Sequence, residues 1–267
     1  MSGARRASLI AVCSIAGMLL LASWQGVGVT DLQHFGTPRN SVLDGERAIT
    51  IPLPAGPPER RSSTVVPQTE GSYSFLFDES GEGPVRYDPC RTIPWVLSPE
   101  GMPVGFSPLL QRAVDRVSLA TGLTFEYEGT TSEAAEFDRS LIQAQYGDRF
   151  APVVVGFSTA TQNPDLEGSV TGVGGSSAVT GAYGDQRFLR AGVIVLDSED
   201  ITSLMSSPSG EQLSEAIVMH EWAHVIGLAH VADPSELMNY SNSSLTTWGP
   251  GDLQGLAVAG DGPCEDV

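Results

Sequence analysis

One short segment of the chain carries residue types and a spacing that suit metal chemistry. It reads His220-Glu221-Trp-Ala-His224-Val-Ile-Gly227-Leu-Ala-His230. Two histidines four residues apart project from the same side of an α-helix, so both imidazoles can bind one zinc ion at about 2.0–2.1 Å. Glu221 follows the first histidine and is able to reach a water on that metal without binding the metal itself. The segment therefore predicts a zinc site with an acid beside it.

The third histidine can join the first two only if the helix ends between them. Ten further residues of helix would carry His230 about 15 Å along the axis, away from His220. Gly227 supplies the helix-ending turn, because glycine adopts the left-handed conformation at no side-chain cost. Three neutral imidazoles leave one coordination position for water, which is typical of catalytic zinc. We prefer this interpretation to a pair of core histidines because the added Gly and His make an accidental match rare.

The expected reaction is peptide-bond hydrolysis by a zinc-dependent endopeptidase. The zinc-bound water is activated by Glu221, which takes its proton and passes it to the leaving amine. Two alternative hypotheses remain: a zinc hydrolase of a non-peptide substrate and an inactive zinc-stabilised extracellular binding domain. Glu221 argues against the inactive domain, since a structural zinc site does not need that acid. An anchored interaction protein with an incidental histidine cluster is disfavoured by the same motif.

Apolar periodicity on either side of the motif predicts the elements that position it. Strands are expected at residues 92–98, 123–127, 152–157 and 191–197, and the Gly/Ser-rich residues 168–184 should form loop and a weak edge strand. One helix should start at Ser107-Pro108 and end at Gly122, and the motif helix should start at Ser207-Pro208. A last helix, residues 251–259, should turn Leu253, Leu256 and Ala257 inward.

The motif, together with Leu237-Met238, resembles the metzincins, and the eight-residue spacing from His230 to Met238 resembles their matrixin branch. The resemblance runs from about Tyr87 to Cys264 and is similar to secreted matrixin-type peptidases of actinobacteria. It implies an α+β catalytic domain with a twisted, mixed five-stranded sheet, two main helices and a C-terminal helix. It also implies that a peptide or protein substrate binds antiparallel to an edge strand, for which residues 172–179 are the candidate.

Two further site residues follow from the resemblance. Met238 would form the Met-turn beneath the metal. Tyr240 resembles the phenol of astacins and serralysins that stabilises the tetrahedral oxyanion, although it can instead line the pocket for the residue after the scissile bond. The second, structural zinc of animal matrixins should be absent, because the remaining histidine of the chain is His34. We therefore expect one catalytic Zn²⁺.

Charge excludes one class of partner. The formal net charge is -18, the chain contains no Lys, and residues 62–267 hold 8 Arg against 28 acids. Nucleic acid is not an expected partner, because its phosphates require a basic surface. Calcium binding by some of these carboxylates stays open, although the spacing of an EF-hand is missing.

The chain is expected to divide into three parts. Residues 1–30, with Arg5 and Arg6 before an uncharged apolar stretch, are predicted to be a signal peptide or signal anchor. Residues 31–86 are a Pro/Gly/Ser-rich linker or pro-segment, and residues 87–267 are the zinc metallopeptidase domain. The product would be secreted or anchored at the cell surface, touching membrane only through an uncleaved N-terminal segment.

The cysteines fit an oxidising compartment. Cys13 lies in the export segment, which leaves Cys90 and Cys264 for a disulfide that closes the domain. An inhibitory cysteine that caps the zinc is the alternative. We discount it because Cys90 directly precedes the first predicted strand, so that no separate pro-segment would follow it.

Overall fold

The computed structural model describes residues 36–54, 60, 65–79, 83–241 and 244–265. The chain divides into two units, residues 1–39 with residue 267 and residues 40–266, and the fold described below is that of the second unit. The predicted export segment, residues 1–30, lies outside the described residues. Within the described part of the chain, no helix is both long and apolar enough to cross a membrane.

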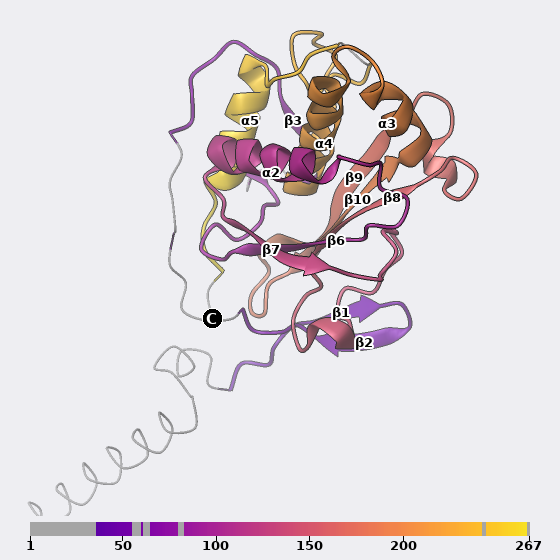
Figure 1. Cartoon of the computed structure of the whole chain (residues 1–267). Coiled ribbons are helices and arrows are strands. Elements are labelled where there is room, and N and C mark those ends of the chain that lie inside the picture. The colour runs from indigo at the N-terminus through magenta and orange to yellow at the C-terminus, as the bar shows by residue number, and fades with distance from the viewer. Residues whose placement is uncertain (1–35, 55–59, 61–64, 80–82, 242–243, 266–267) are drawn as a thin grey trace, which may run out of the picture. The chain divides into compact units, whose positions relative to one another are not determined.

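A five-stranded mixed sheet forms the centre of the domain, in the order β7-β6-β8-β10-β9 (Figure 1). Its strands are β6 (Ile93–Leu97), β7 (Phe125–Thr130), β8 (Val153–Ser158), β9 (Gly172–Thr180) and β10 (Arg187–Asp197). The first four strands of this order, β7, β6, β8 and β10, run parallel to one another, whereas β9 pairs antiparallel with β10 and is the last strand of the order. The edge strand expected at residues 172–179 is therefore present, and it is a regular strand of nine residues.

Helices cover one face of this sheet, as Figure 1 shows. They are α2 (Ser107–Thr121), α3 (Ser198–Met205), α4 (Gly210–Ile226) and α5 (Pro250–Gly260). Two short 3-10 turns, Ala144–Tyr146 and Pro164–Leu166, lie in the connections. The predicted α+β fold with a mixed five-stranded sheet, two main helices and a C-terminal helix is confirmed.

Three local expectations need correction. α3 was not predicted, and it begins where the Asp197 carboxylate accepts hydrogen bonds from the Glu199 and Asp200 amides. The Ser207-Pro208 pair lies between α3 and α4 and does not start the motif helix, whose N-cap is Ser209. Leu253 does not turn inward, because its side chain is 38% exposed.

Burial explains why the two main helices form. In α2 the buried positions include Leu110, Val114 and Val117 at helical spacing, and the helix ends at Gly122 with φ 72°. α4 is buried over most of its circumference, since it packs against α2, α3, β9 and β10. A helix enclosed in this way holds its side chains in fixed positions, which suits a metal site.

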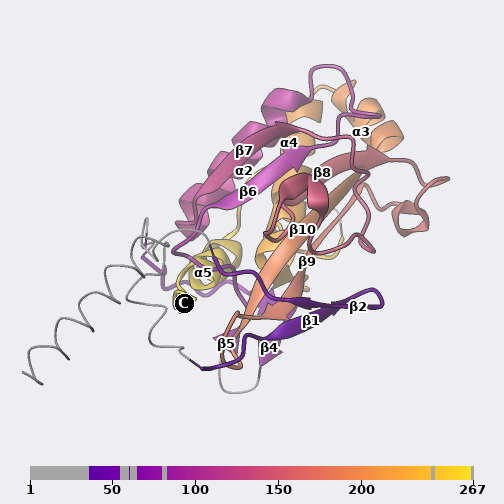
Figure 2. The ribbon, with the colours of Figure 1, turned by 90° about the horizontal axis from the view of Figure 1, so that it is seen from below.

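Short N-terminal strands complete the unit. The hairpin of β1 (Ser41–Asp44) and β2 (Arg47–Thr50) lies on the sheet face opposite the helices (Figures 1 and 2), where Ile51 packs with Val179 and Ala182. β3 (Ser74–Phe75) pairs with β11 (Leu228–Ala229), and β4 (Asp78–Glu79) pairs with β5 (Gly83–Pro84). The division at residue 86 stays a prediction.

A disulfide joins Cys90, which precedes β6, to Cys264, which follows α5. The two cysteines are 174 residues apart in sequence, and their Cα atoms are 5.5 Å apart. The bond closes almost the whole helix-and-sheet unit into one loop. The predicted pairing of these two cysteines is confirmed.

Candidate metal centre

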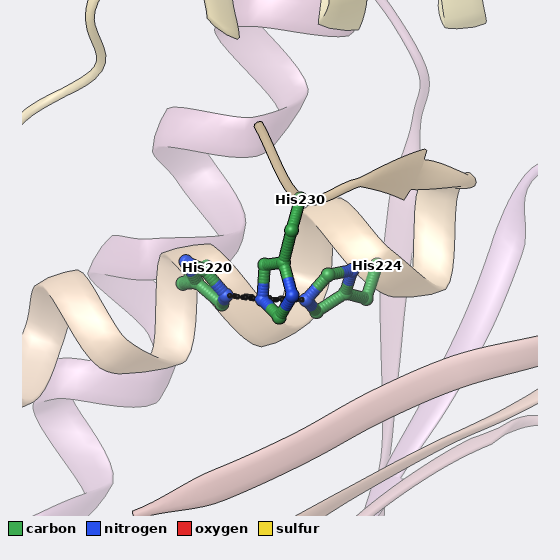
Figure 3. A group of neighbouring side chains, drawn as sticks. All are labelled: His220, His224 and His230. Carbon is green, nitrogen blue, oxygen red and sulfur yellow. Dashed lines mark hydrogen bonds between the residues drawn. The ribbon is translucent and has the colours of Figure 1, made fainter. Parts of the chain in front are cut away.

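The three histidines meet at the C-terminal end of α4 (Figure 3). His220 and His224 project from adjacent turns of that helix. The helix ends at Gly227, whose φ of 108° is left-handed, and the two-residue strand β11 carries the chain back to His230. A reversal this tight brings the third imidazole beside the first two.

The three Nε2 atoms form a nearly equilateral triangle. Their separations are 2.9 Å for His220 and His230, 3.0 Å for His224 and His230, and 3.1 Å for His220 and His224. The dashed lines in Figure 3 join these atoms. An ion about 2 Å from each nitrogen would stand close above the triangle, which is the distance that zinc requires from imidazole.

Backbone carbonyls determine which ring nitrogen of His220 and of His224 carries a hydrogen and which presents a lone pair to the centre. Nδ1 of His220 lies 2.7 Å from the Leu237 carbonyl oxygen, and Nδ1 of His224 lies 2.8 Å from that of Leu228. A carbonyl only accepts, so both Nδ1 atoms carry the hydrogen and both Nε2 atoms present lone pairs. Two lone pairs at 3.1 Å repel each other unless a cation lies between them. The donor set therefore fits a zinc ion.

Burial keeps these imidazoles neutral. It lowers the pKa of His220 to about 4 and that of His224 to about 3, and it also lowers the pKa of the more exposed His230. All three rings consequently hold a free lone pair at neutral pH, which is the form that binds a metal.

Glu221 lies on the same helix, and its side chain is 5% exposed. Burial raises the pKa of this carboxyl to about 8, and no described residue donates a hydrogen bond to it. A dication at the neighbouring histidines would favour the ionised form instead. Glu221 is therefore a buried acid whose charge depends on the occupant of the histidine site.

Two glycines of β9 make room for Glu221. A Cβ atom placed on Gly172 would lie 3.0 Å from the Glu221 Cγ and 3.1 Å from its Oε1, and one on Gly174 would lie 2.3 Å from the Glu221 carbonyl oxygen. Only glycine allows the edge strand to approach the helix so closely. One face of β9 thus packs directly against the acid, and among the described residues no strand pairs with the outer edge of β9.

The loop after His230 closes on itself next to His220. The Val231 amide donates to the Met238 carbonyl at 2.9 Å, and the Tyr240 amide donates to the Val231 carbonyl at 3.3 Å. Met238 is buried, whereas Tyr240 is 67% exposed. Leu237, which directly precedes Met238, supplies the carbonyl that orients His220.

Asp252 holds this loop from α5. Its carboxylate accepts hydrogen bonds from the amides of Leu237 at 2.5 Å, Met238 at 3.2 Å and Gly249 at 2.9 Å. Asp252 is fully buried, and its own amide donates to the Glu236 carboxylate at 2.9 Å. Sequence reasoning missed this residue, although Pro250 with an acid two positions later is a helix-start signal that could have drawn attention to it.

The chain shows a distant likeness to two solved structures of other proteins. No protein-family model matches the chain, and no curated protein matches it. Archaemetzincin from Methanopyrus kandleri aligns at a TM-score of 0.38 and 16% identity, over 62% of this chain and 93% of that one. Metalloproteinase-II from Bacteroides fragilis aligns at a TM-score of 0.33 and 13% sequence identity, and the alignment covers 74% of this chain and 54% of that one. These likenesses are too weak to assign a family or a function.

Proposed function

We propose that this protein is a zinc endopeptidase of the metzincin kind, with His220, His224 and His230 as the zinc ligands. The observation that carries the proposal is the convergence of three Nε2 atoms within 3.1 Å of one another. The Nδ1 atoms of His220 and His224 donate hydrogen bonds to backbone carbonyls, so the lone pairs on the two Nε2 atoms face a common point. The eight-residue spacing from His230 to Met238 supports a matrixin-like branch.

Glu221 is the proposed general base. Bound zinc supplies a Lewis acid that polarises a carbonyl and acidifies water. Glu221 accepts the proton of the attacking water at its carboxylate and returns it to the leaving amine. The burial of Glu221 excludes bulk water from its side chain. Among the described residues, no other group donates a hydrogen bond to this carboxylate and competes with the water. Met238 forms part of the buried floor of the site, and Tyr240 is proposed as a pocket wall.

The edge strand β9 supports a peptide as the substrate. No strand of the described residues pairs with its outer edge, and Gly172 and Gly174 lie against Glu221. An extended peptide that adds to this edge would place its backbone next to the acid, with main-chain hydrogen bonds supplying affinity. A substrate without a peptide backbone would have no such use for the strand.

An extracytoplasmic location is the proposed setting. The Cys90–Cys264 disulfide supports it, because such bonds persist in oxidising compartments. The N-terminal export segment remains a prediction of the sequence, as does its use as a membrane anchor.

Hydrolysis of casein by the purified protein tests the proposal. We expect turnover that a chelator abolishes and that added zinc restores. Zinc binding without hydrolysis of casein or of a peptide library would identify a zinc-stabilised binding domain instead. Hydrolysis that persists in the chelated protein would contradict the proposal outright.

A further inference from the structure

A segment outside the zinc motif pairs directly with the strand that leads into the third histidine. We call this segment, residues 71–77, the strap. Its strand β3 pairs antiparallel with β11, with Phe75 opposite Leu228 and Ser74 opposite Ala229. The Leu76 amide extends the pairing by donating to the Gly227 carbonyl at 2.8 Å. The strap therefore contacts every residue between the end of α4 and His230.

The residues that the strap contacts orient two of the histidines. The Leu228 carbonyl accepts the hydrogen bond from Nδ1 of His224 at 2.8 Å, and Ala229 immediately precedes His230. β11 has only two residues, and a strand this short is not stable without a partner. The pairing with β3 consequently holds both the hydrogen-bond partner of His224 and the backbone that carries His230.

The strap also lies in backbone contact with α5. A Cβ atom on Gly71 would lie 2.0 Å from the Gly251 nitrogen, and one on Gly251 would lie 2.2 Å from the Ser72 carbonyl oxygen. Farther along, a Cβ atom on Gly255 would lie 2.9 Å from that of Tyr73. Glycines on both sides of the contact thus allow an approach that no other residue type permits.

Side-chain hydrogen bonds add to this backbone contact. The hydroxyl of Thr69, two residues before the strap, donates to the Gln254 side chain at 2.9 Å, and the Ser72 hydroxyl of the strap donates to the Asp233 carboxylate at 3.3 Å. Asp233 belongs to the loop after His230, and Gln254 belongs to α5. The strap therefore contacts three elements near the site: β11, the loop after His230, and α5.

From this placement we propose that the strap is a permanent part of the metal centre, and that its backbone positions His224 and His230 for zinc. The inference rests on the proposed zinc function. It means that residues 71–77 remain with the active protein, although they precede the domain boundary predicted at residue 87. A removable pro-segment would have to end before the strap.

A matched pair of variants at Leu76 tests the role of the strap in the full chain. Leu76→Pro removes the N–H that donates to Gly227, while Leu76→Ala keeps it and trims a side chain that is 44% exposed. We expect Leu76→Pro to bind zinc at least about tenfold more weakly than Leu76→Ala, because removal of groups that orient metal ligands weakens metal binding by about that factor or more. Competition with a chromogenic chelator gives the affinities.

A spectroscopic reading separates positioning from general destabilisation. Cobalt substituted for zinc should show a different visible absorption spectrum in Leu76→Pro from that in Leu76→Ala, at temperatures where both metal-free proteins are folded. Equal zinc affinities and identical cobalt spectra in the two variants would overturn the inference. Failure of the wild type to bind zinc would instead refute the proposed function.

Hydrogen exchange of the wild type covers the case in which Leu76→Pro does not fold. If the strap positions the ligands, zinc must stabilise the strap in return, because coupling is reciprocal. Amides of residues 74–76 should exchange at least about tenfold more slowly with zinc than without it, while those of the β1–β2 hairpin should change little. Unchanged exchange of residues 74–76 would overturn the inference.

Discussion

Replacing both disulfide cysteines by serine, as Cys90→Ser with Cys264→Ser, should destabilise the domain without altering the metal site. The two residues are 174 positions apart, and in the chain-entropy model a bond across a loop of that length removes unfolded-state entropy worth about 5 kcal/mol. Measured losses are often smaller than this model gives, so we expect a loss of about 3–5 kcal/mol. Neither cysteine contacts a histidine of the triad, so zinc affinity should stay within about threefold.

Urea unfolding at a fixed excess of zinc measures this loss, with the oxidised wild type as the reference. The wild type in reductant is the control, because it breaks the same bond without a substitution. A loss below about 1 kcal/mol would refute the reasoning that the loop closure stabilises the domain. Thiol titration of the unfolded wild type provides an independent check, since Cys90 and Cys264 should contribute no free thiol.

Three further changes probe the surroundings of the site. Tyr240→Phe should lower kcat less than about threefold at unchanged zinc content, because the side chain is 67% exposed; a loss of 10²-fold or more would identify an oxyanion donor. Gly174→Ala places a Cβ atom 2.3 Å from the Glu221 carbonyl, so urea unfolding should show a loss of about 1–3 kcal/mol and turnover should fall; a wild-type result would contradict the close packing. Burial raises the pKa of Asp252 from 3.8 to about 6, so the folded state keeps a proton that the unfolded chain releases, and stability falls as the pH rises through this window. In urea unfolding of the metal-free proteins, the wild type should lose up to about 3 kcal/mol relative to Asp252→Asn between about pH 4 and pH 7, whereas parallel curves would show that Asp252 does not titrate there.

The motif was readable from the sequence because its geometry is local. Helical spacing alone brings His220 and His224 together, and a glycine at position 227 is a recognisable end for the helix. The strands with continuous apolar runs, such as β8 and β10, were readable for the same reason, since their pattern does not depend on distant partners. The identity of the bound metal and the role of Glu221 stay predictions.

The parts that sequence reasoning missed depend on contacts between distant segments. Nothing local in β3 indicates that its two residues pair with β11 more than 150 positions later. Glycines at positions 172 and 174 predict a weak strand, yet their lack of side chains is what lets β9 pack against α4. Asp252 likewise gains its role only when α5 meets the loop that contains Met238.

The central claim is that Glu221 acts as the general base of a zinc-dependent hydrolase. Glu221→Gln keeps the size and polarity of the side chain but removes the base, and the turnover of a peptide by this variant, at measured zinc content, is the most direct test. We predict one zinc per chain, as in the wild type, and a turnover at least about 10²-fold lower. Near-normal turnover by the zinc-loaded variant would contradict the account.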